Sequence, residues 1–267
     1  MSRRLSRHER LEWIAQRLGE AGFVSVAELS GDLGVSAVTV RADLDRLQRA
    51  GRLIRTHGGA LPAAEDESAL SFTVRQRIHM AQKERIGRAA AATVADGEAL
   101  ILDASTTALQ VARYLLPRHD LTVLTTGLHV ALELLRSPGI TVIMPGGPLW
   151  HEAASVVGDW ECQALADGNF QRGFFGGRGL SLEEGLTDAH RPEVDLNRRL
   201  VASVREVNVV LDGSKIGKVA YASCAGVEEI DRVFTTPEAP NGGAPGARAF
   251  QEVIAGLRAR SVQVEIV

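Results

Sequence analysis

Short polar segments follow apolar runs in the second part of this 267-residue chain, and their residue types suit the binding of an anion. The first segment is Asp-Ala-Ser-Thr-Thr at 103–107, which leads directly into a helical pattern. Free backbone amides, the helix dipole and three hydroxyl groups would converge there, so a phosphate is the natural occupant. The alternative is that Ser105 or Thr106 only caps the helix. The candidate anion-binding residues are Asp103, Ser105, Thr106 and Thr107.

Three later segments have a similar character. The run 125–127 again offers hydroxyls, and the Pro-Gly-Gly run 145–147 would let the backbone approach a ligand closely. The run 212–215 adds a carboxylate and an ammonium group. Two plainer interpretations stay open, since a Gly-Gly pair is often just a turn and Lys215 could be solvated. The further candidates for binding a small-molecule effector are Thr125, Thr126, Gly127, Gly146, Gly147, Asp212 and Lys215.

The same groups raise the question of catalysis, because Asp103, Asp188 and Asp212 with Lys215 could abstract and return a proton. The sequence sets none of them at a catalytic geometry, so we do not expect an enzyme.

Metal-binding and cofactor patterns are missing from the sequence. Cys162 and Cys224 are far apart and have no C-x-x-C or Cys/His spacing, which predicts neither a disulfide framework nor a zinc site. We therefore expect no metal and no cofactor. His151, Glu152 and His190 are expected to be solvated loop residues.

Apolar runs and amphipathic stretches alternate around these segments and predict the elements that position them. The expected strands span 99–102, 121–125, 141–144, 207–211, 232–235 and 262–267. The expected helices span 106–115, 128–135, 194–205 and 249–258, after a long helix at 72–94 whose Lys83, Arg85 and Arg88 should form a solvated face. This alternation predicts an α/β fold with a mostly parallel sheet, whose ligands bind beyond the carboxyl ends of the strands.

The first sixty residues predict three helices of a different kind. Leu11, Ile14 and Leu18 share one face of the first helix, and Ser25 with Glu28 forms a capping box that opens a short second one. Gly34 supplies a turn, and Ser36 caps a third helix from about 37 to 50. A tight turn between two helices is the arrangement that places the second in the DNA major groove.

The third helix separates into an apolar and a polar face. Val40, Leu44 and Leu47 should pack inward. On the other side, arginines can contact phosphates or guanine edges, and small apolar side chains can touch thymine methyl groups. Arg46 and Arg49 could instead pair with Asp43 or Asp45. A short basic hairpin at 53–60 should form a wing. The candidate DNA-binding residues are Ser36, Val38, Thr39, Arg41, Ala42, Arg46, Arg49, Arg55 and His57.

The runs Val-Ser-Ala-Val-Thr-Val-Arg-Ala-Asp-Leu at 35–44 and Gly-Arg-Leu-Ile-Arg-Thr-His-Gly-Gly-Ala at 51–60 resemble the DeoR family of bacterial repressors. Ala42 stands where many members have a second Arg. The resemblance extends to the effector domain, which in that family is similar to ribose-5-phosphate isomerase. The family pattern D-x-G-T-T, T-N, G-G, G-x-T and D-x-S-K is matched around 103, 125, 146, 185 and 212, and Ser105 and Thr126 replace the usual Gly and Asn. The resemblance implies a sugar-phosphate pocket that includes Gly185. Because of the isomerase-like fold that it implies, a sugar-phosphate isomerase-like enzyme that carries a DNA-binding domain remains the alternative.

Composition and charge set the wider expectations. The chain carries a net charge of −3, but residues 1–60 hold ten Lys or Arg against seven Asp or Glu, which favours nucleic acid as partner of this end. We expect a winged helix-turn-helix at 1–60, a linker at 61–71 and an effector-binding and oligomerisation domain at 72–267. With no apolar signal segment and no membrane-spanning run, the chain should be cytoplasmic. Its expected partners are double-stranded operator DNA, a small phosphorylated sugar and a second or further copies of itself, as a homodimer or homotetramer.

Overall fold

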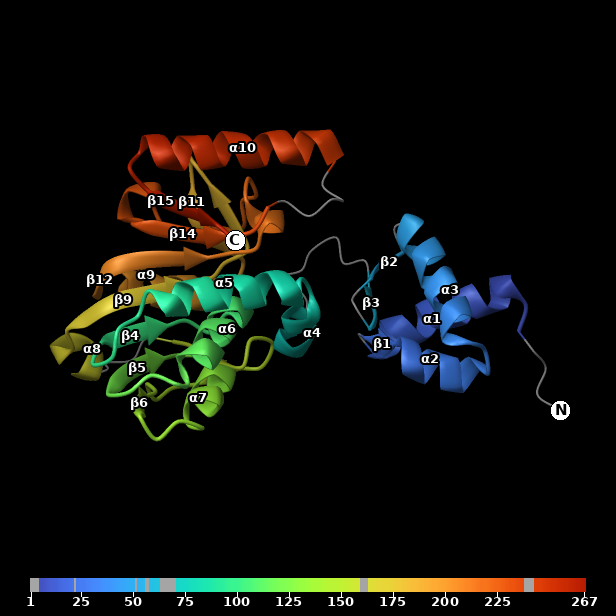
Figure 1. The fold of residues 1–267 in the computed structure, drawn as a ribbon, viewed down its shortest axis with the longest axis horizontal. Helices are drawn as coiled ribbons and strands as arrows, with labels where there is room; N and C mark the ends of the chain where they lie inside the picture. The colour runs from blue at the N-terminus through green and yellow to red at the C-terminus, as the bar shows by residue number, and fades with distance from the viewer. Residues whose placement is uncertain are drawn as a thin grey trace. The chain divides into compact units, whose positions relative to one another are not determined.

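The structure is a computed structural model that describes residues 5–21, 23–50, 52–55, 58–62, 71–158, 163–237 and 243–267. The chain divides into two compact units, Met1–Ile78 and His79–Val267 (Figure 1). Each unit has a hydrophobic core of its own. The functional bounds 1–60, 61–71 and 72–267 stay a prediction.

The first unit packs three helices against a small antiparallel sheet. The helices are α1 (Arg7–Ala21), α2 (Val26–Leu33) and α3 (Ala37–Arg49). The strands β1 (Val24–Ser25), β2 (Leu53–Arg55) and β3 (Gly59–Pro62) lie in the order β1-β3-β2. Helix α4 (Phe72–Arg77) ends this unit. The three predicted helices and the hairpin are confirmed, whereas β1 was not predicted, because two residues carry no periodicity.

Local sequence explains where these helices begin and end. Both halves of the predicted capping box form, since the Glu28 amide donates to Ser25 Oγ and the Ser25 amide donates to Glu28 Oε2. Gly34 ends α2 in the left-handed conformation, with φ 61° and ψ 32°. The short α2 therefore starts and stops through its own side chains, and α3 follows after a tight turn.

The second unit is built on a seven-stranded sheet in the order β15-β14-β12-β9-β4-β5-β6, in which every pairing is parallel. Its strands are β4 (Ala99–Leu102), β5 (Leu121–Thr125), β6 (Ile140–Ile143), β9 (Phe170–Phe175), β12 (Val204–Val210), β14 (Arg232–Thr235) and β15 (Gln263–Ile266). From β4 the chain builds outward through β5 and β6, and it then returns to the other side of β4 with β9. The strand order thus reverses between β4 and β9.

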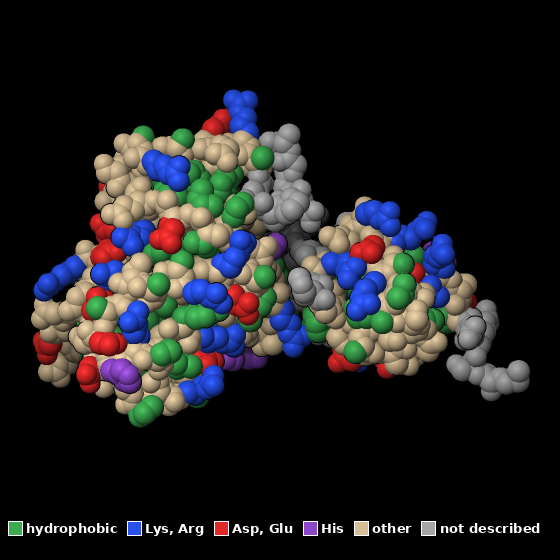
Figure 2. All heavy atoms as spheres, viewed as in Figure 1, with side chains coloured by type: hydrophobic (Ala, Val, Ile, Leu, Met, Phe, Trp, Pro, Cys, Tyr) green, Lys and Arg blue, Asp and Glu red, His purple; other side chains and the backbone are tan. Residues whose placement is uncertain are grey.

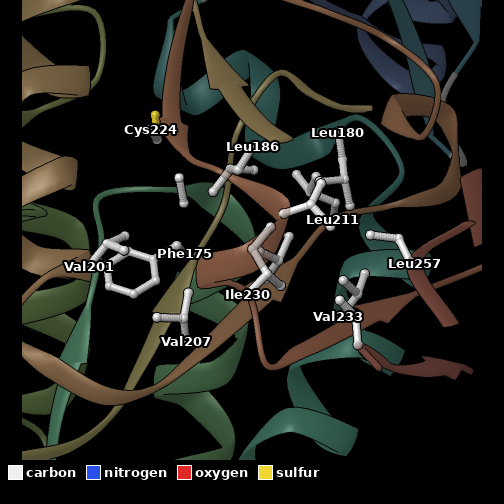
Figure 3. Close-up of a cluster of buried hydrophobic side chains, with 14 of the residues drawn as sticks. Phe175, Leu180, Leu186, Val201, Val207, Leu211, Cys224, Ile230, Val233 and Leu257 are labelled. Atoms are coloured by element: carbon white, nitrogen blue, oxygen red, sulfur yellow. The ribbon is translucent and has the colours of Figure 1, made fainter. Parts of the chain in front are cut away.

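Helices cover the sheet. Helices α5 (Met80–Ala92), α6 (Thr106–Leu115) and α7 (Leu128–Leu134) pack side by side in a row (Figure 1). Side chains of α9 (Arg191–Val201) and α10 (Gly243–Ala259) share a core with the sheet, in which Phe175 lies next to Val201 and Val207 (Figure 3). Consecutive residues 100–102 are fully buried, which shows that both faces of the sheet are covered.

Smaller elements stand near the carboxyl ends of the main strands. Strands β10 (Gly179–Ser181), β11 (Gly185–Asp188) and β13 (Ala222–Ala225) form an antiparallel sheet. Strands β7 (Leu149–Trp150) and β8 (Ser155–Val156) form a hairpin. The other short elements are helix α8 (Gln163–Asp167) and two 3₁₀ turns, Gly213–Lys215 and Val227–Glu229.

The mostly parallel α/β fold is confirmed, but several elements differ from the prediction. The helix expected at 194–205 ends at Val201, and residues 204 and 205 already belong to β12, which the sheet extends beyond its apolar run. The long helix expected at 72–94 is broken into α4 and α5, because Ile78 is extended and His79 adopts the left-handed conformation with φ 52°. Strand β9, at the centre of the sheet, was not predicted. Its sequence places Gln, Arg and Gly between aromatic residues and therefore shows neither an apolar run nor a clean alternation.

Candidate DNA-binding surface and effector site

Helix α3 has the two faces that its sequence predicts. Val40, Leu44 and Leu47 are buried in the core of the first unit, whereas the side chain of Val38 is 73% exposed. The other predicted contacts on the outer face, Arg41, Ala42, Arg46 and Arg49, are also exposed, and Thr39 is half-buried. A large apolar side chain is left in water beside three cations, which is a surface suited to a duplex.

The start of α3 is closed by its own hydroxyl groups. Ser36 Oγ accepts the amide of Thr39 at 3.2 Å and lies 3.0 Å from Thr39 Oγ1. Ser36 therefore caps the helix, as the sequence predicts, and its hydroxyl group lies next to that of Thr39. Their position at a helix N-terminus also suits contact with a backbone phosphate.

Some of the charged side chains near α3 are held in ion pairs, and others take part in none of the described ion pairs. Asp43 is 3% exposed and accepts from Arg10 Nε at 2.5 Å, so it serves the packing of α1 on α3. Asp45 pairs with Arg55 of β2, and Arg49 Nε donates to the Asp45 carbonyl. Neither Asp43 nor Asp45 pairs with Arg46 or Arg49 through its carboxylate in the described ion pairs.

The predicted wing is only partly described. Strands β2 and β3 pair in antiparallel fashion, and Arg55 also donates to the Arg41 carbonyl at 3.4 Å. Arg55 is thus held against α3 by two interactions. His57 lies outside the described residues. In Figure 2, basic side chains stand on the visible face of the first unit.

In the second unit, two loops meet at the point where the strand order reverses. Asp103 follows β4 and Gly176 follows β9. Asp103 Oδ2 accepts the amide of Gly176 at 2.7 Å, and its Oδ1 accepts the amide of Ser105 at 2.9 Å. A crevice at such a reversal, outside the carboxyl ends of parallel strands, is where open α/β sheets bind ligands.

Asp103 therefore has a structural role in this site. It is 2% exposed, and burial raises its pKa to about 6 although the hydrogen bonds from Ser105 and Gly176 favour the charged form. Because both carboxylate oxygens already accept backbone amides, Asp103 fixes the shapes of the loops after β4 and β9.

The hydroxyl-rich loops pack against one another beside Asp103. Ser105 Oγ accepts the amide of Ala108 and caps α6, while Thr106 and Thr107 are each 3% exposed. A Cβ on Gly127 would lie 2.8 Å from the Cα of Ala104, so only glycine permits this approach of the β4 and β5 loops. Thr125 and Thr126 are buried at 0% and 2%, and Thr125 Oγ1 accepts the Gly127 amide.

Asp212 and Lys215 extend the same edge across β9. Lys215 Nζ donates to the carbonyl of Gly177 at 3.1 Å, next to the glycine that Asp103 holds. Asp212 Oδ1 accepts from the amide and hydroxyl of Ser214, whereas its Oδ2, buried, has no hydrogen-bond partner among the described residues. Burial alone would raise the pKa of Asp212, but the ammonium groups of Lys215 and Lys83 outweigh it and hold that pKa below its ordinary value.

Three glycines that were predicted to bind the effector do not lie in the loops that meet at Asp103. Gly185 begins β11 at the turn from β10 with φ 65°, and a Cβ on it would lie 2.1 Å from the carbonyl oxygen of Ala225. The turn alone therefore explains this glycine. Gly146 and Gly147 lie exposed between β6 and β7, with no contact to the Asp103 loop among the described hydrogen bonds.

A second group of side chains near this edge was not predicted. Arg178 Nε lies 3.6 Å from Asp188 Oδ1, and His190 stacks on Trp150 with ring centroids 3.4 Å apart. Ser155 of β8 donates to Glu193 of α9 at 2.7 Å. The expectation of a solvated His190 is wrong, because the ring packs on Trp150 and burial lowers its pKa. His151 and Glu152 are exposed as expected.

The prediction for Lys83 is wrong. It was expected on a solvated face with Arg85 and Arg88, and those two are exposed, but Lys83 is only 2% exposed. Its position three residues before buried Ile86 was the available signal, since residues i and i+3 share a helical face.

Neither a metal site nor a membrane span is evident in the described part of the chain. No group of three or more His, Cys, Asp or Glu side chains there could hold a metal ion. None of the described helices has the length and apolar character needed to cross a bilayer.

Comparison with known proteins identifies the two parts. Residues 10–65 match the model of the DeoR-like helix-turn-helix domain, and residues 78–236 match that of the DeoR C-terminal sensor domain. The chain belongs to the DeoR family. It is a DNA-binding transcriptional regulator with a sensor domain, as the family resemblance predicts.

Curated relatives of this DeoR-family protein match over most of both chains. The putative aga operon transcriptional repressor of Escherichia coli O157:H7 is 34% identical over 92% of this chain and 93% of its own. The regulator GolR of Listeria innocua is 34% identical over 85% and 89%, and the glycerol-3-phosphate regulon repressor of Escherichia coli K12 is 29% identical over 87% and 92%.

Among solved structures, ribose-5-phosphate isomerase from Plasmodium falciparum is similar with 15% identity, 52% of each chain covered and a TM-score of 0.37.

Proposed function

We propose that this DeoR-family protein represses genes of carbohydrate catabolism and that a phosphorylated sugar modulates its binding to operator DNA. One relative supports the chemical class, since it is named the glycerol-3-phosphate regulon repressor. The single observation that carries the proposal is the edge at the strand-order reversal. There the hydroxyl-rich loop 103–107, a helix N-terminus and a buried lysine meet.

The proposed DNA contacts are the exposed positions of α3 and the wing. Arg41 and Arg46 supply positive charges that are engaged in none of the described ion pairs. Val38 and Ala42 supply small apolar contacts, and Ser36 and Thr39 face a phosphate at the start of the helix. Arg49 and Arg55 contribute after rearranging around Asp45, and His57 completes the proposed set.

The proposed effector contacts are the residues of the loops after β4, β5 and β12. Ser105, Thr106 and Thr107 offer hydroxyl and amide donors to the phosphate, and Lys215 neutralises its charge. Thr125, Thr126, Gly127 and Asp212 line the sugar side, and Gly146 and Gly147 bound the outer rim. Asp103 shapes the loops, and Gly185 acts only through the turn of β10 and β11.

Assembly is part of the proposal. Two recognition helices reading a two-fold operator need half-sites about 34 Å apart or a multiple of that distance, which a homodimer or homotetramer provides. The proposed site of action is the cytoplasm, where both operator DNA and phosphorylated sugars are present.

The test separates the two activities by mutation. In the full-length chain, Arg41→Ala should weaken the binding of an operator selected from a random DNA pool by about 1 kcal/mol or more and reduce its salt dependence, and effector binding should stay unchanged. Lys215→Ala should abolish the effector response and leave DNA binding intact. Fluorescence anisotropy of labelled operator measures both, with glycerol 3-phosphate, glucose 6-phosphate and ribose 5-phosphate as candidate effectors.

Exposed basic residues provide the matched controls. Arg17→Ala on α1 and Lys218→Ala beyond the 3₁₀ turn remove similar charges outside the proposed contacts. If Arg41→Ala binds DNA like the wild type, Arg41 is not a contact. If Lys215→Ala still responds to the effector, the site is misplaced.

The isomerase alternative has its own readout. Asp103 has a raised pKa, which a general base requires, but its two oxygens are occupied by backbone amides. We therefore expect no turnover of glucose 6-phosphate or ribose 5-phosphate by the wild type, and turnover removed by Asp212→Asn would instead establish an enzyme.

A further inference from the structure

An aromatic pair lies beside the phosphate-binding loops, and the proposed function does not use it. Trp150 of β7 and His190, the residue before α9, stack with ring centroids 3.4 Å apart and an angle of 14° between the ring planes. Both side chains are half-buried. The two residues come from segments far apart in the sequence, so the fold brings these rings together.

The hairpin that carries Trp150 is attached to the loop after β5. The amide of Val156 in β8 donates to the carbonyl of Thr126 at 2.8 Å. The same loop approaches the hydroxyl-rich loop 103–107 closely at Gly127. The hairpin is therefore connected, through one loop, to the proposed phosphate contacts.

The segment that carries His190 reaches the same edge by way of β11. The amide of Arg178, in the loop after β9, donates to the carbonyl of Thr187 at 2.8 Å, and Arg178 Nε lies 3.6 Å from Asp188 Oδ1. Burial raises the pKa of Asp103 and lowers that of His190, and the negative charge of Asp188 favours the protonated form of both groups. Asp188 is thus near enough to influence both Asp103 and His190.

Glu193 of α9 holds the hairpin and His190 together. Its Oε1 accepts the hydroxyl group of Ser155, the residue opposite Trp150 in the hairpin, at 2.7 Å. Its Oε2 lies 4.0 Å from Nδ1 of His190. Nδ1 is buried, whereas 27% of the His190 side chain is exposed. The other atoms of the imidazole ring are therefore the part that a ligand can reach.

The chemistry of this pair suits the uncharged part of a sugar phosphate. The flat faces of aromatic rings pack against C–H groups, and the nitrogen atoms of indole and imidazole form hydrogen bonds with hydroxyl groups. Small-molecule sites combine such rings with a few polar groups that fix the orientation of the ligand. An ester whose phosphate is held at the loop 103–107 has its sugar left to be recognised, and the aromatic pair lies at the same edge.

We propose that Trp150 and His190 are specificity-determining residues of the effector site, which contact the carbon chain and the hydroxyl groups of the sugar beyond its phosphate. The proposal rests on the proposed function and defines its ligand more closely. The effector is a phosphate ester whose sugar is large enough to pack on an aromatic ring, and a short ester such as glycerol 3-phosphate binds more weakly.

The experiment measures selectivity in the full-length chain. Calorimetric titration with glucose 6-phosphate, ribose 5-phosphate, glycerol 3-phosphate and inorganic phosphate gives a dissociation constant for each. We expect the wild type to bind one of the two sugar phosphates about tenfold or more tightly than glycerol 3-phosphate. Trp150→Ala should remove most of this difference by weakening the binding of the sugar phosphate.

Three further variants separate recognition from folding. Trp150→Phe keeps an aromatic ring and should retain more of the selectivity than Trp150→Ala. His190→Phe keeps the stacking without the ring nitrogens, so it should weaken the binding of the sugar phosphate and not that of inorganic phosphate. Leu149→Ala changes an exposed side chain on the opposite face of β7 and should match the wild type.

A purely structural role of the pair would give a different pattern. A loosened hairpin would weaken the binding of every ligand by the same factor, inorganic phosphate included, and selectivity would stay unchanged in Trp150→Ala. That result, unchanged affinities in Trp150→Ala and His190→Phe, or a wild type that binds the three esters equally would overturn the inference. The proposed function would stand in each case, provided Lys215→Ala loses binding. A wild type that binds none of the esters would overturn both.

Discussion

At the scale of single residues, the buried carboxylates of the sensor differ in what they can offer a ligand. Asp103 and Asp212 are each 2% exposed, and each follows a strand of the central sheet. Asp103 gives both oxygens to backbone amides, whereas Asp212 keeps one oxygen without a partner among the described residues. Asp103 therefore serves the geometry of the loops, whereas Asp212 retains one carboxylate oxygen for the ligand contact that we propose for it.

The raised pKa of Asp103 predicts a pH dependence of stability. Its pKa is 3.8 in the unfolded reference and about 6 when buried, so the folded state holds the proton more tightly. The free energy of unfolding should therefore fall as pH rises from about 4 to about 6, by up to about 3 kcal/mol from this group.

Asp103→Asn should remove that fall, because an amide does not titrate. Urea unfolding of both proteins between pH 4.5 and 7.5 gives the difference in their free energies of unfolding at each pH. A difference that stays constant across this range would show that Asp103 is ionised throughout.

At the scale of elements, two helical glycines have opposite reasons for being there. A Cβ on Gly87 of α5 would lie 2.6 Å from the backbone of Gln110 in α6, so this glycine permits the close approach of the two helices. A Cβ on Gly31 of α2 would meet nothing within 4 Å. Helix propensity favours alanine at both positions, and packing opposes it at only one.

Alanine substitutions should therefore change stability in opposite directions. Gly31→Ala should stabilise the first unit by about 0.5–1 kcal/mol. Gly87→Ala should destabilise the second unit by about 1–3 kcal/mol, because the steric cost exceeds the gain in propensity. Chemical unfolding followed by circular dichroism measures both, and a stabilised Gly87→Ala would mean that α5 can move away from α6 at little cost.

At the scale of the whole molecule, each compact unit has a separate core. The core of the first unit centres on residues such as Ile14 and Leu44, and that of the second on residues such as Phe175 and Val209. A core of this kind is what a domain needs to fold by itself.

A fragment of residues 79–267 should consequently fold and bind sugar phosphate without binding DNA. Its cooperative thermal transition and its affinity for the effector should match those of the second unit in the full chain, as calorimetry can measure. An unfolded fragment would show that residues before 79 complete the sensor.

The sequence alone determined the local structural features of this protein. The capping box of α2, the inward face of α3, the bounds of α6 and β5, and the loop 103–107 all depend on neighbouring residues. Their periodicities and caps express local physical preferences, so they could be predicted from spacing. The family motifs identified most of the proposed site in the same way.

Only the tertiary structure decided which residues far apart in the sequence interact. Strand β9 lies at the centre of the sheet because its neighbours bury it, and its mixed sequence gives no sign of that. Asp103 accepts the amide of Gly176, 73 positions later in the chain, and Lys83 is buried although it was expected in solvent. Burial and long-range hydrogen bonds arise only when elements far apart in sequence pack together.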